Sequence, residues 1–384
     1  MVGMEETVRY TYRLRPGRTA AKALTSEWHR VRWLWNECVR LQREGHRPTM
    51  KLLGMELTAA RRRQPWLREG SQVAQQQMLR TYDKALRHSF QVKGRGRPTM
   101  KKRRGSLPSL EYTTRGFSIR DSRLVLPKGV TIPVVWSRDL PSAPSSVRIS
   151  QDSLGHWYAS FVVRRESEEL PEASGGIGID WGVSTTATTT DQDYDLPHLG
   201  HRRRSTAELA KAQRKMARRR RRRGHTPSNG YKRAKREAAK AAKTAERRNT
   251  HEGRVWARKV VNSHQTIAVE DFKPSFLAKS TMARKSADNA VGTAKRTLIE
   301  YAERAGRKVV LVQPAYTTMT CSACFARTKR LGLNVRTFLC PDCGHSEDRD
   351  RNAARVILAV AERGHTSVES VRHSLPPIEV SGAA

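Results

Sequence analysis

The sequence has little cysteine and no long apolar run, and each shortage excludes a class of protein. Its 384 residues include five cysteines, too few for the disulfide framework of a small secreted domain. No stretch approaches the ~18 consecutive apolar residues that a membrane-spanning helix needs. The N-terminus, Met1–Thr7, also lacks the apolar region of a signal peptide. We therefore expect a soluble protein of the cytoplasm with no membrane partner.

Acidic residues are scarce relative to basic ones. The chain has 74 Lys and Arg against 36 Asp and Glu, a formal net charge of +38. This excess is larger than solubility requires and indicates a polyanionic partner. A ribosome-associated protein and a membrane-surface protein are alternatives, but the latter would place its charge on an amphipathic helix with a bulky apolar face. Residues 201–260 hold 23 Lys and Arg and 4 acidic residues, mostly among alanines, which favours nucleic acid.

One run of six arginines, Arg218–Arg223, stands out within this basic region. A solvated helix face is the ordinary explanation for a charge run. Six uncompensated neighbours repel one another, however, and a phosphate backbone would relieve that repulsion with release of counterions. The run supports the prediction of a nucleic-acid partner.

The first 170 residues combine helical and alternating patterns. Residues Thr7–Arg13 alternate as a strand, and an apolar stripe that includes Cys38 predicts a helix as far as Gln42. We interpret Cys38 as a buried core thiol. Further helices are expected over Met50–Arg63 and Val73–Phe90, and the basic segment Lys93–Arg104 is expected to be a loop. Period-two patterns then predict strands at Phe117–Ile119, Arg123–Leu126, Thr131–Trp136, Ser146–Ser150 and Trp157–Arg164. We expect a small β-barrel, with Thr7–Arg13 as its first strand and helices of residues 17–92 inserted into it.

The rest of the chain has the alternation of an α/β domain. Apolar strands end on carboxylates at Gly176–Asp180 and Gln265–Glu270, and the basic helices between them break at Gly224–Gly230. A helix over Asp288–Ala305, a strand over Lys308–Val312 and a last helix over Asn352–Arg363 are expected. The tail, residues 364–384, is polar and contains proline, so we expect it to be disordered.

Four of the five cysteines form two C-x-x-C pairs, Cys321/Cys324 and Cys340/Cys343, with fifteen residues between them. Zn²⁺ favours four tetrahedral N or S ligands. Both cysteines of a C-x-x-C pair lie on a single turn and can therefore bind the same metal ion. The spacing is within the usual zinc-ribbon range. Since no coordination position would remain open, we expect a structural zinc site. His345 lies two residues beyond the last cysteine and is interpreted as a bystander.

Three carboxylates are candidates for catalysis: Asp180 and Glu270 at strand ends, and Asp350 at the start of the last helix. Strand ends and helix starts can converge on one edge of an α/β sheet. Carboxylates meeting there would repel one another unless cations lay between them, and two Mg²⁺ ions ~3.5–4 Å apart could hydrolyse a phosphodiester. Each also has an ordinary explanation: Asp180 as the start of a turn, Glu270 as the partner of an arginine, and Asp348 or Asp350 as a helix cap.

The order of these motifs resembles the insertion-sequence TnpB (OrfB) family, compact relatives of type V CRISPR effectors. The motifs, in order along the chain, are Tyr12-Arg-Leu-Arg-Pro16, Arg32-Trp-Leu-Trp-Asn36, Asp152-Ser-Leu-Gly-His-Trp-Tyr-Ala-Ser-Phe161, Gly178-Ile-Asp-Trp-Gly-Val183, Ile267-Ala-Val-Glu-Asp271, Pro314-Ala-Tyr-Thr317, the cysteine pairs and Asp350-Arg-Asn-Ala-Ala354. The resemblance covers nearly the whole chain except the tail. No single motif is decisive, but their order is highly specific.

The resemblance implies a multidomain RNA-guided DNA endonuclease. It implies a wedge β-barrel (1–16 and 93–170), a helical recognition insertion (17–92), a RuvC (RNase H-like) nuclease domain (171–313 and 346–363) and an inserted zinc ribbon (314–345). Asp180, Glu270 and Asp350 would be the catalytic Mg²⁺ ligands, and the four cysteines would bind Zn²⁺. Its partners would be an element-derived guide RNA, with one chain per RNA, and a target double-stranded DNA at the nucleoid.

The sequence also departs from the family pattern. Trp181 replaces a smaller aliphatic residue, which we expect to alter the packing beside Asp180. Phe325 follows Cys324 where glycine is usual, so we expect the first knuckle to turn differently from the second, which keeps Gly344. The preference for Asp350 over Asp348 rests on the D-x-N-A-A match alone.

Several other functions remain as alternatives. The chain could be an RNA-guided DNA-binding repressor without cleavage, or a type V effector that takes its guide from a CRISPR array. A transposase that transfers strands itself is disfavoured, because no second set of catalytic motifs is present. A zinc-ribbon transcription factor would leave the strand-end carboxylates unexplained.

Overall fold

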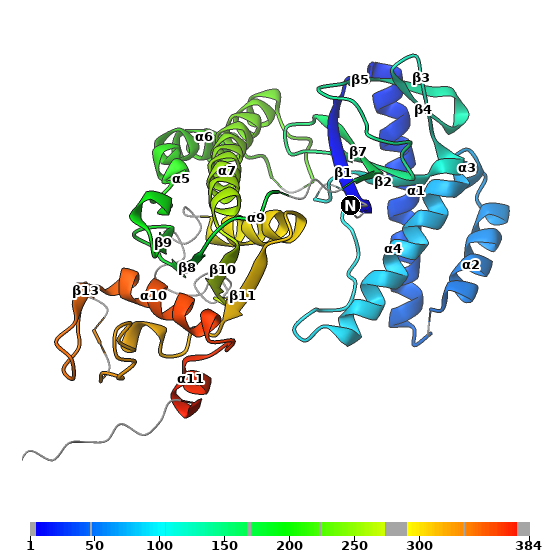
Figure 1. Cartoon of the computed structure of the whole chain (residues 1–384). Coiled ribbons are helices and arrows are strands. Elements are labelled where there is room, and N and C mark those ends of the chain that lie inside the picture. Colours follow the sequence, from blue (N-terminus) through cyan, green and yellow to red (C-terminus); the bar gives the residue numbers. More distant parts are fainter. Residues whose placement is uncertain are drawn as a thin grey trace, which may run out of the picture. The chain divides into compact units, whose positions relative to one another are not determined.

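The protein is described by a computed structural model that covers residues 5–46, 48–103, 105–166, 170–222, 224–272, 290–329, 331–332 and 335–374. The chain divides into two compact units, unit 1 (Met1–Glu166) and unit 2 (Ser167–Ala384) (Figure 1). Each unit has its own apolar core. Among the described residues, no helix is both long enough and apolar enough to cross a membrane.

Unit 1 contains a curled antiparallel sheet of seven strands in the order β2-β6-β7-β1-β5-β4-β3. The strands are β1 (Glu5–Leu14), β2 (Ser109–Thr113), β3 (Ser118–Arg120), β4 (Arg123–Leu126), β5 (Val130–Val135), β6 (Ser146–Gln151) and β7 (Trp157–Glu166). The first strand pairs along its whole length with β7, from Glu5↔Glu166 to Leu14↔Trp157, and its end also pairs with β5. The prediction that residues 7–13 form the first strand of this sheet is confirmed, whereas β2 was not predicted. We expected a small β-barrel. Among the described residues, the sheet is curled but open, with β2 and β3 as its edge strands.

The helices of unit 1 lie between the first and second strands in sequence. They are α1 (Arg18–Arg43), α2 (Met50–Arg63), α3 (Pro65–Arg68) and α4 (Gln72–Gln91). The apolar faces of the helices share one core with the sheet, into which Trp157, Phe161 and Val163 of β7 also point. Cys38 is 3% exposed in this core, and burial raises the pKa of its thiol to about 12. The interpretation of Cys38 as a core residue is confirmed.

Unit 2 is built on a mixed sheet of four strands in the order β11-β10-β8-β9. The strands are β8 (Gly176–Trp181), β9 (Ala187–Thr189), β10 (Thr266–Glu270) and β11 (Lys308–Val312). The central strand β10 runs parallel to both β8 and β11, and β9 is antiparallel to β8. The two predicted apolar strands that end on carboxylates are therefore neighbours in one sheet.

Helices cover both faces of this sheet. They are α7 (Asn229–Ser263) and α9 (Val291–Arg304) on one face and α10 (Arg349–Glu362) on the other. Ile177, Ile179 and Val269 pack with α7 and α9. The alternate residue Ala268 instead packs with α10, as the period of two in a strand requires. Two shorter basic helices, α5 (His201–Arg204) and α6 (Thr206–Arg218), precede α7.

The C-terminal segment differs from the prediction of disorder. Residues Val368–Ser374 form helix α11. Val368 and Val371 are 0% exposed and pack in the same apolar cluster as Val356 and Val360 of α10. The prediction is wrong for this helix because two valines three residues apart give it an apolar face that α10 can cover. The last ten residues lie outside the described part of the chain.

Candidate active site and metal centre

The four cysteines of the two C-x-x-C pairs come together in unit 2. Their sulfur atoms all lie within 4.8 Å of one another, and the closest contacts are Cys321 Sγ to Cys343 Sγ at 3.7 Å and Cys324 Sγ to Cys340 Sγ at 3.6 Å. The hairpin of β12 (Thr337–Leu339) and β13 (Ser346–Asp348) carries the second pair between its strands. Within the described ranges, this is the single group of three or more metal-ligating side chains with such short separations. The cluster could hold a metal such as zinc.

The two cysteine knuckles turn in the same way, contrary to expectation. Phe325 has φ +61° and Gly344 has φ +75°, so both residues after the second cysteine adopt the left-handed conformation. A bulky residue is strained there, but Phe325 is only 4% exposed and packs against Val356 and other residues of α10. The guanidinium of Arg363 also lies 4.1 Å from the centre of its ring. We infer that packing offsets the strain of this turn.

Asn352 joins the first cysteine knuckle to α10, a role that sequence reasoning missed. Its Nδ2 donates to the carbonyl oxygen of Thr320 (2.8 Å), and its Oδ1 accepts from the backbone N–H of Ser322 (2.9 Å). Asn352 is 0% exposed, so both bonds are shielded from water. The Asp350-Arg-Asn-Ala-Ala motif was the available signal: it places an amide two residues after the candidate carboxylate.

Asp180 and Glu270 are neighbours at the carboxyl ends of β8 and β10. The parallel register pairs Ile179 with Val269, so the next residue of each strand is one of the two carboxylates. Strand alternation turns both toward α10, since Gly178 approaches α10 and Ala268 packs against it. Asp180 is 5% exposed and Glu270 7%. The structure brings these two predicted residues together.

Burial and mutual repulsion act on both carboxyl groups. Burial, followed by the charges of Glu270 and Asp350, raises the pKa of Asp180 well above its usual range. Burial also raises the pKa of Glu270 to about 7, although the backbone N–H of Trp181 and the ammonium of Lys295 oppose the shift. Two carboxylates crowded in a buried place favour either a proton or a cation between them.

The structure distinguishes Asp348 from Asp350. Asp348 is the N-cap of α10, and its Oδ1 accepts from the backbone N–H groups of Asp350 and Arg351, both at 3.0 Å. Asp350 is in the first helical turn, where its carboxylate contacts Arg349 (3.1 Å) and Arg336 (3.6 Å). Its charge adds to the burial that raises the pKa of Asp180 and Glu270, and the charge of Asp348 also acts on Asp180. Because Asp348 is engaged in the helix cap, Asp350 stays the predicted site residue.

Lys295 fixes the end of β10, and nothing in the sequence pointed to it. Its ammonium donates to the carbonyl oxygens of Glu270 (3.0 Å) and Phe272 (3.2 Å) and to Asp271 Oδ1 (3.0 Å). The Lys295 side chain is 11% exposed. A buried cation with three acceptors holds the backbone of Glu270 in place.

Close packing at Gly178 sets the distance between α10 and the sheet. A Cβ at this position would lie 2.0 Å from the carbonyl oxygen of Ala354 and 2.9 Å from Leu358 Cβ. Only a residue without a side chain lets the helix backbone approach so closely. On the other face, Trp181 packs edge-on against Trp256, with ring centres 5.8 Å apart. Trp181 was expected to alter the packing beside Asp180. In the structure, its aromatic contact lies on the face of the sheet away from α10.

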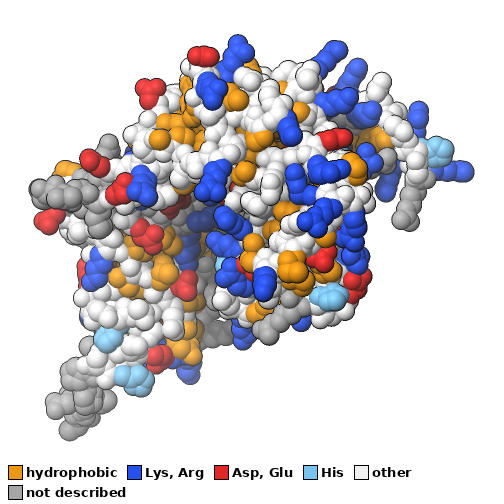
Figure 2. Space-filling model, turned by 90° about the vertical axis from the view of Figure 1, so that its right-hand side faces the viewer, with side chains coloured by type: hydrophobic (Ala, Val, Ile, Leu, Met, Phe, Trp, Pro, Cys, Tyr) orange, Lys and Arg blue, Asp and Glu red, His pale blue; other side chains and the backbone are white. Residues whose placement is uncertain are grey.

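Basic side chains line the exposed face of α7. They recur at spacings of three, four and seven residues and are Arg233, Arg236, Lys240, Arg247, Arg254 and Arg258, while alanines and valines form the buried face. On the molecular face drawn in Figure 2, Lys and Arg side chains are more widespread than Asp and Glu. The exposed face of α7 is a candidate nucleic-acid interface.

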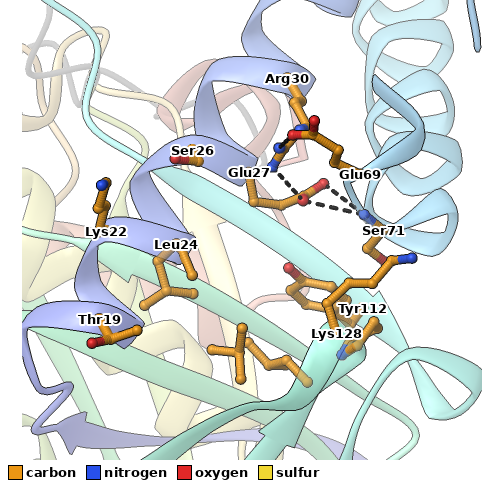
Figure 3. A pocket seen from close by; sticks show the side chains of 14 residues that line it. Thr19, Lys22, Leu24, Ser26, Glu27, Arg30, Glu69, Ser71, Tyr112 and Lys128 are labelled. Atoms are coloured by element: carbon orange, nitrogen blue, oxygen red, sulfur yellow. Dashed lines mark hydrogen bonds and ion pairs between the residues drawn. The ribbon is translucent and has the colours of Figure 1, made fainter. Parts of the chain in front are cut away.

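Unit 1 contains a cavity of about 330 Å³ between α1 and the turn after β4 (Figure 3). Glu27 lies on its wall, where its carboxylate accepts from the backbone N–H of Ser71 (3.1 Å) and contacts Arg30 (3.5 Å). Burial raises the pKa of Glu27. Since its oxygens are used to hold the start of α4, we interpret this carboxylate as structural.

Two family models match this chain, and together they cover most of unit 2. The family model "Probable transposase" (OrfB, IS605) matches residues 160–281, which include Asp180 and Glu270. The model "Cas12f1-like, TNB domain" matches residues 292–357, which include the four cysteines and Asp350. A Streptomyces pristinaespiralis protein named "Putative RNA-guided DNA endonuclease" is 32% identical over 80% of this chain and 76% of its own length.

Two further similarities extend over almost the full length. An Escherichia coli K12 protein, "Putative RNA-guided DNA endonuclease InsQ", is 26% identical over 97% of both chains. The solved structure of Cas12f1 in a complex with sgRNA and target DNA aligns with a TM-score of 0.51 at 14% identity, covering 93% of this chain and 99% of that one. This structural similarity shows a shared fold. The chain belongs to the TnpB (OrfB) family of insertion-sequence RNA-guided endonucleases.

Proposed function

We propose that this protein is an RNA-guided DNA endonuclease of a transposable element, which hydrolyses target DNA at one Mg²⁺-dependent site. The site would consist of Asp180, Glu270 and Asp350. The observation that supports it most directly is the placement of Asp180 and Glu270 side by side at the ends of β8 and β10, on the face toward α10. The names of the relatives and the nucleic acids in the Cas12f1 complex support the activity and its partners.

The domains of this proposal follow the two units. In unit 2, residues 171–313 and 346–363 would form a RuvC (RNase H-like) nuclease domain, interrupted by a zinc ribbon at 314–345. In unit 1, residues 1–16 and 93–170 would form the wedge domain, with the recognition helices in 17–92. One chain would bind one element-derived guide RNA, and base pairing would select the target DNA at the nucleoid.

The chemistry of the donor set fits the proposed Mg²⁺. This hard cation prefers carboxylate oxygens, and a cation would relieve the repulsion that raises the pKa of Asp180 and Glu270. The carboxylate of Asp350, which contacts the guanidinium of Arg349, would bind Mg²⁺ in its place. When bound, Mg²⁺ would polarise the scissile phosphate and lower the pKa of the attacking water.

The roles of the neighbouring residues follow from their contacts. Lys295 would hold the backbone of Glu270, at the end of β10, in a fixed position beside β8. Asp348, as the N-cap, would set the start of α10 and the position of Asp350. The four cysteines would hold Zn²⁺ with no open coordination position, so this zinc would be structural. Asn352 would attach the ribbon to α10 through its hydrogen bond to Ser322.

The test is cleavage of plasmid DNA by the full chain, reconstituted with RNA transcribed from the end of its element. Asp180→Asn and Glu270→Gln should abolish cleavage while RNA binding and target binding stay near wild type, because both replacements keep the side-chain shape. Asp193→Asn, an exposed carboxylate of the same unit, is the matched control and should cut normally. Wild-type cleavage by Asp180→Asn would exclude the proposed site; a wild-type protein that binds RNA and target but never cuts would favour the repressor alternative.

A further inference from the structure

The basic segment between α4 and β2 has no role in the proposed nuclease site. Its described part, residues 92–103, is called the strap here and is the cyan coil that follows α4 in Figure 1. The strap contains six described basic residues and no acidic one: Lys93, Arg95, Arg97, Lys101, Lys102 and Arg103. Five of these are exposed, and the sixth, Lys101, is half-buried.

The strap is attached to α1 by four hydrogen bonds near its C-terminal end. Trp35 Nε1 donates to the carbonyl oxygen of Thr99 (2.9 Å), and Asn36 Oδ1 accepts from the backbone N–H of Lys101 (2.8 Å). The carbonyl oxygen of Lys101 accepts from Arg32 Nη1 (3.2 Å) and Asn36 Nδ2 (3.3 Å). These four hydrogen bonds fix the backbone of the strap, which would otherwise be flexible because the segment is rich in glycine.

The ammonium of Lys101 is inserted among aromatic rings. It lies 3.6 Å from the ring centre of Trp35 and 5.4 Å from that of Trp28, and Trp35 itself packs edge-on against Tyr82 of α4. Burial of this cation lowers the pKa of Lys101 to about 8. Glu111, which lines the same small pocket, is already paired with Arg148 at 2.6 Å. An indole cage therefore holds a cation that has no carboxylate partner among the described residues.

The attachment concentrates positive charge that the described part of unit 1 does not neutralise. Burial, followed by the charges of Arg103 and Arg32, lowers the pKa of His29, so both guanidinium groups act on this part of α1. Positive charge gathered at one place on the surface favours an anionic partner.

An exposed aromatic ring stands at the start of the strap. Phe90, in the last turn of α4, is 68% exposed, and the guanidinium of Arg97 lies 5.6 Å from its ring centre. Proteins that bind single-stranded nucleic acid combine a basic groove with aromatic side chains on which unpaired bases stack. A paired base in a duplex cannot offer its face to such a ring.

We propose that the strap, held on α1 by Lys101 and Trp35, binds a single-stranded segment of nucleic acid. Its exposed Lys and Arg side chains would bind successive phosphates, and Phe90 would stack on an unpaired base. This inference rests on the proposed function only in that RNA and DNA are the partners, and it adds a defined contact outside the nuclease site. The segment could belong to the guide RNA or to an unpaired DNA strand, since both present the same phosphate and base chemistry.

The first test measures binding of the full chain to a 12-nucleotide oligouridine RNA, the matching DNA strand and a 12-base-pair duplex. Phe90→Ala should weaken single-strand binding about 5- to 100-fold, the range expected for loss of one stacked base, and leave duplex binding unchanged. Met55→Ala is the matched control, because Met55 is a 62% exposed apolar residue of α2. Equal losses for single strand and duplex, or no loss for either, would overturn the proposal. A larger effect on RNA than on DNA would assign the segment to the guide.

The second test locates the contact directly. Ultraviolet crosslinking of 4-thiouridine RNA, or of the matching 4-thiothymidine DNA, to the wild-type chain should give adducts in the peptide that spans Phe90–Arg103. Asn36→Ala should reduce them, because it removes two of the four hydrogen bonds that hold the strap. Absence of adducts there with both the RNA and the DNA probe, in a chain that crosslinks elsewhere, would refute the proposal. Cleavage by wild type and Asp180→Asn is measured in parallel, so that a failure of the nuclease proposal is recognised separately from a failure of the strap.

Discussion

Arg351 of α10 and Asp195, which follows β9, are joined by two hydrogen bonds across 156 residues of sequence, at 3.1 Å and 2.8 Å. Arg351 also donates to the carbonyl oxygen of Thr189 (2.6 Å), and Asp195 accepts from the backbone N–H of the same threonine (2.8 Å). This pair therefore fastens the helix that carries Asp350 to the edge of the sheet that carries Asp180.

Replacement of Arg351 by alanine should lower the free energy of unfolding by about 2 kcal/mol, because it leaves a half-buried carboxylate without its cation. The measurement is urea unfolding of wild type and variant. Lys215→Ala is the control in the same unit: its pair with Glu237 (3.1 Å) joins side chains that are 36% and 45% exposed, and such pairs are worth about 0–1 kcal/mol. Equal losses for the two variants would contradict this account.

Gly178→Ala should displace α10 from the sheet and strongly reduce cleavage. Its new methyl group would meet the backbone oxygen of Ala354 at 2.0 Å, so the helix, and with it Asp350, must move. Gly176→Ala is the matched control, because its methyl group would meet Leu358 Cδ1, the end of a flexible side chain, at 2.8 Å. Cleavage rates and thermal unfolding of both variants would be compared; normal cleavage by Gly178→Ala would show that the spacing does not matter.

Lys295→Met should reduce cleavage without loss of RNA binding. The variant keeps the side-chain length but removes the three hydrogen bonds that hold the end of β10 beside Glu270. Arg296→Gln, an exposed neighbour on α9, should leave cleavage unchanged. A Lys295→Met protein that cuts normally would mean that the strand end is held by its other contacts.

Loss of the proposed zinc from the four-cysteine cluster should unfold the segment that carries the cysteines. Cys340→Ser should lower the zinc content measured by mass spectrometry and the melting temperature, since structural zinc sites contribute directly to folding. Cys38→Ser, which changes a buried thiol of unit 1, serves as the control and should keep the wild-type zinc content. A stoichiometric metal in Cys340→Ser would contradict the four-cysteine site.

Lys101 predicts a pH dependence of stability. Its pKa is lowered from 10.5 to about 8 in the folded chain, so between these values the unfolded chain binds more protons. Stability should therefore rise with pH across the window from 8 to 10.5, and this group should contribute no slope below it. Urea unfolding at pH 7, 9 and 10 should show that Lys101→Met removes the rise, whereas Lys102→Met, at an exposed position, keeps it. An unchanged slope in Lys101→Met would refute the assignment.

Local patterns were sufficient to predict most elements of the fold. The helix Met50–Arg63 and the strands Arg123–Leu126 and Lys308–Val312 have the predicted bounds, because apolar periodicity, turn residues and caps act within a few neighbouring residues. The strand β2 was missed, since a five-residue stretch with two buried positions gives only a weak alternating signal. Apolar strands ending on Asp180 and Glu270 were also recognisable in the sequence, but their pairing was not.

The sequence by itself determined the two C-x-x-C pairs, the basic character of the chain and the three candidate carboxylates, because spacing and composition are properties of the chain alone. The tertiary structure decided which aspartate caps α10, how Phe325 takes the turn expected of glycine, and that Asn352, Lys295 and Lys101 hold the surroundings of the sites. Except for the helix cap, whose partners are two and three residues away, those outcomes depend on partners that lie tens of residues away. Such partners meet only when the sheet, the helices and the strap have packed.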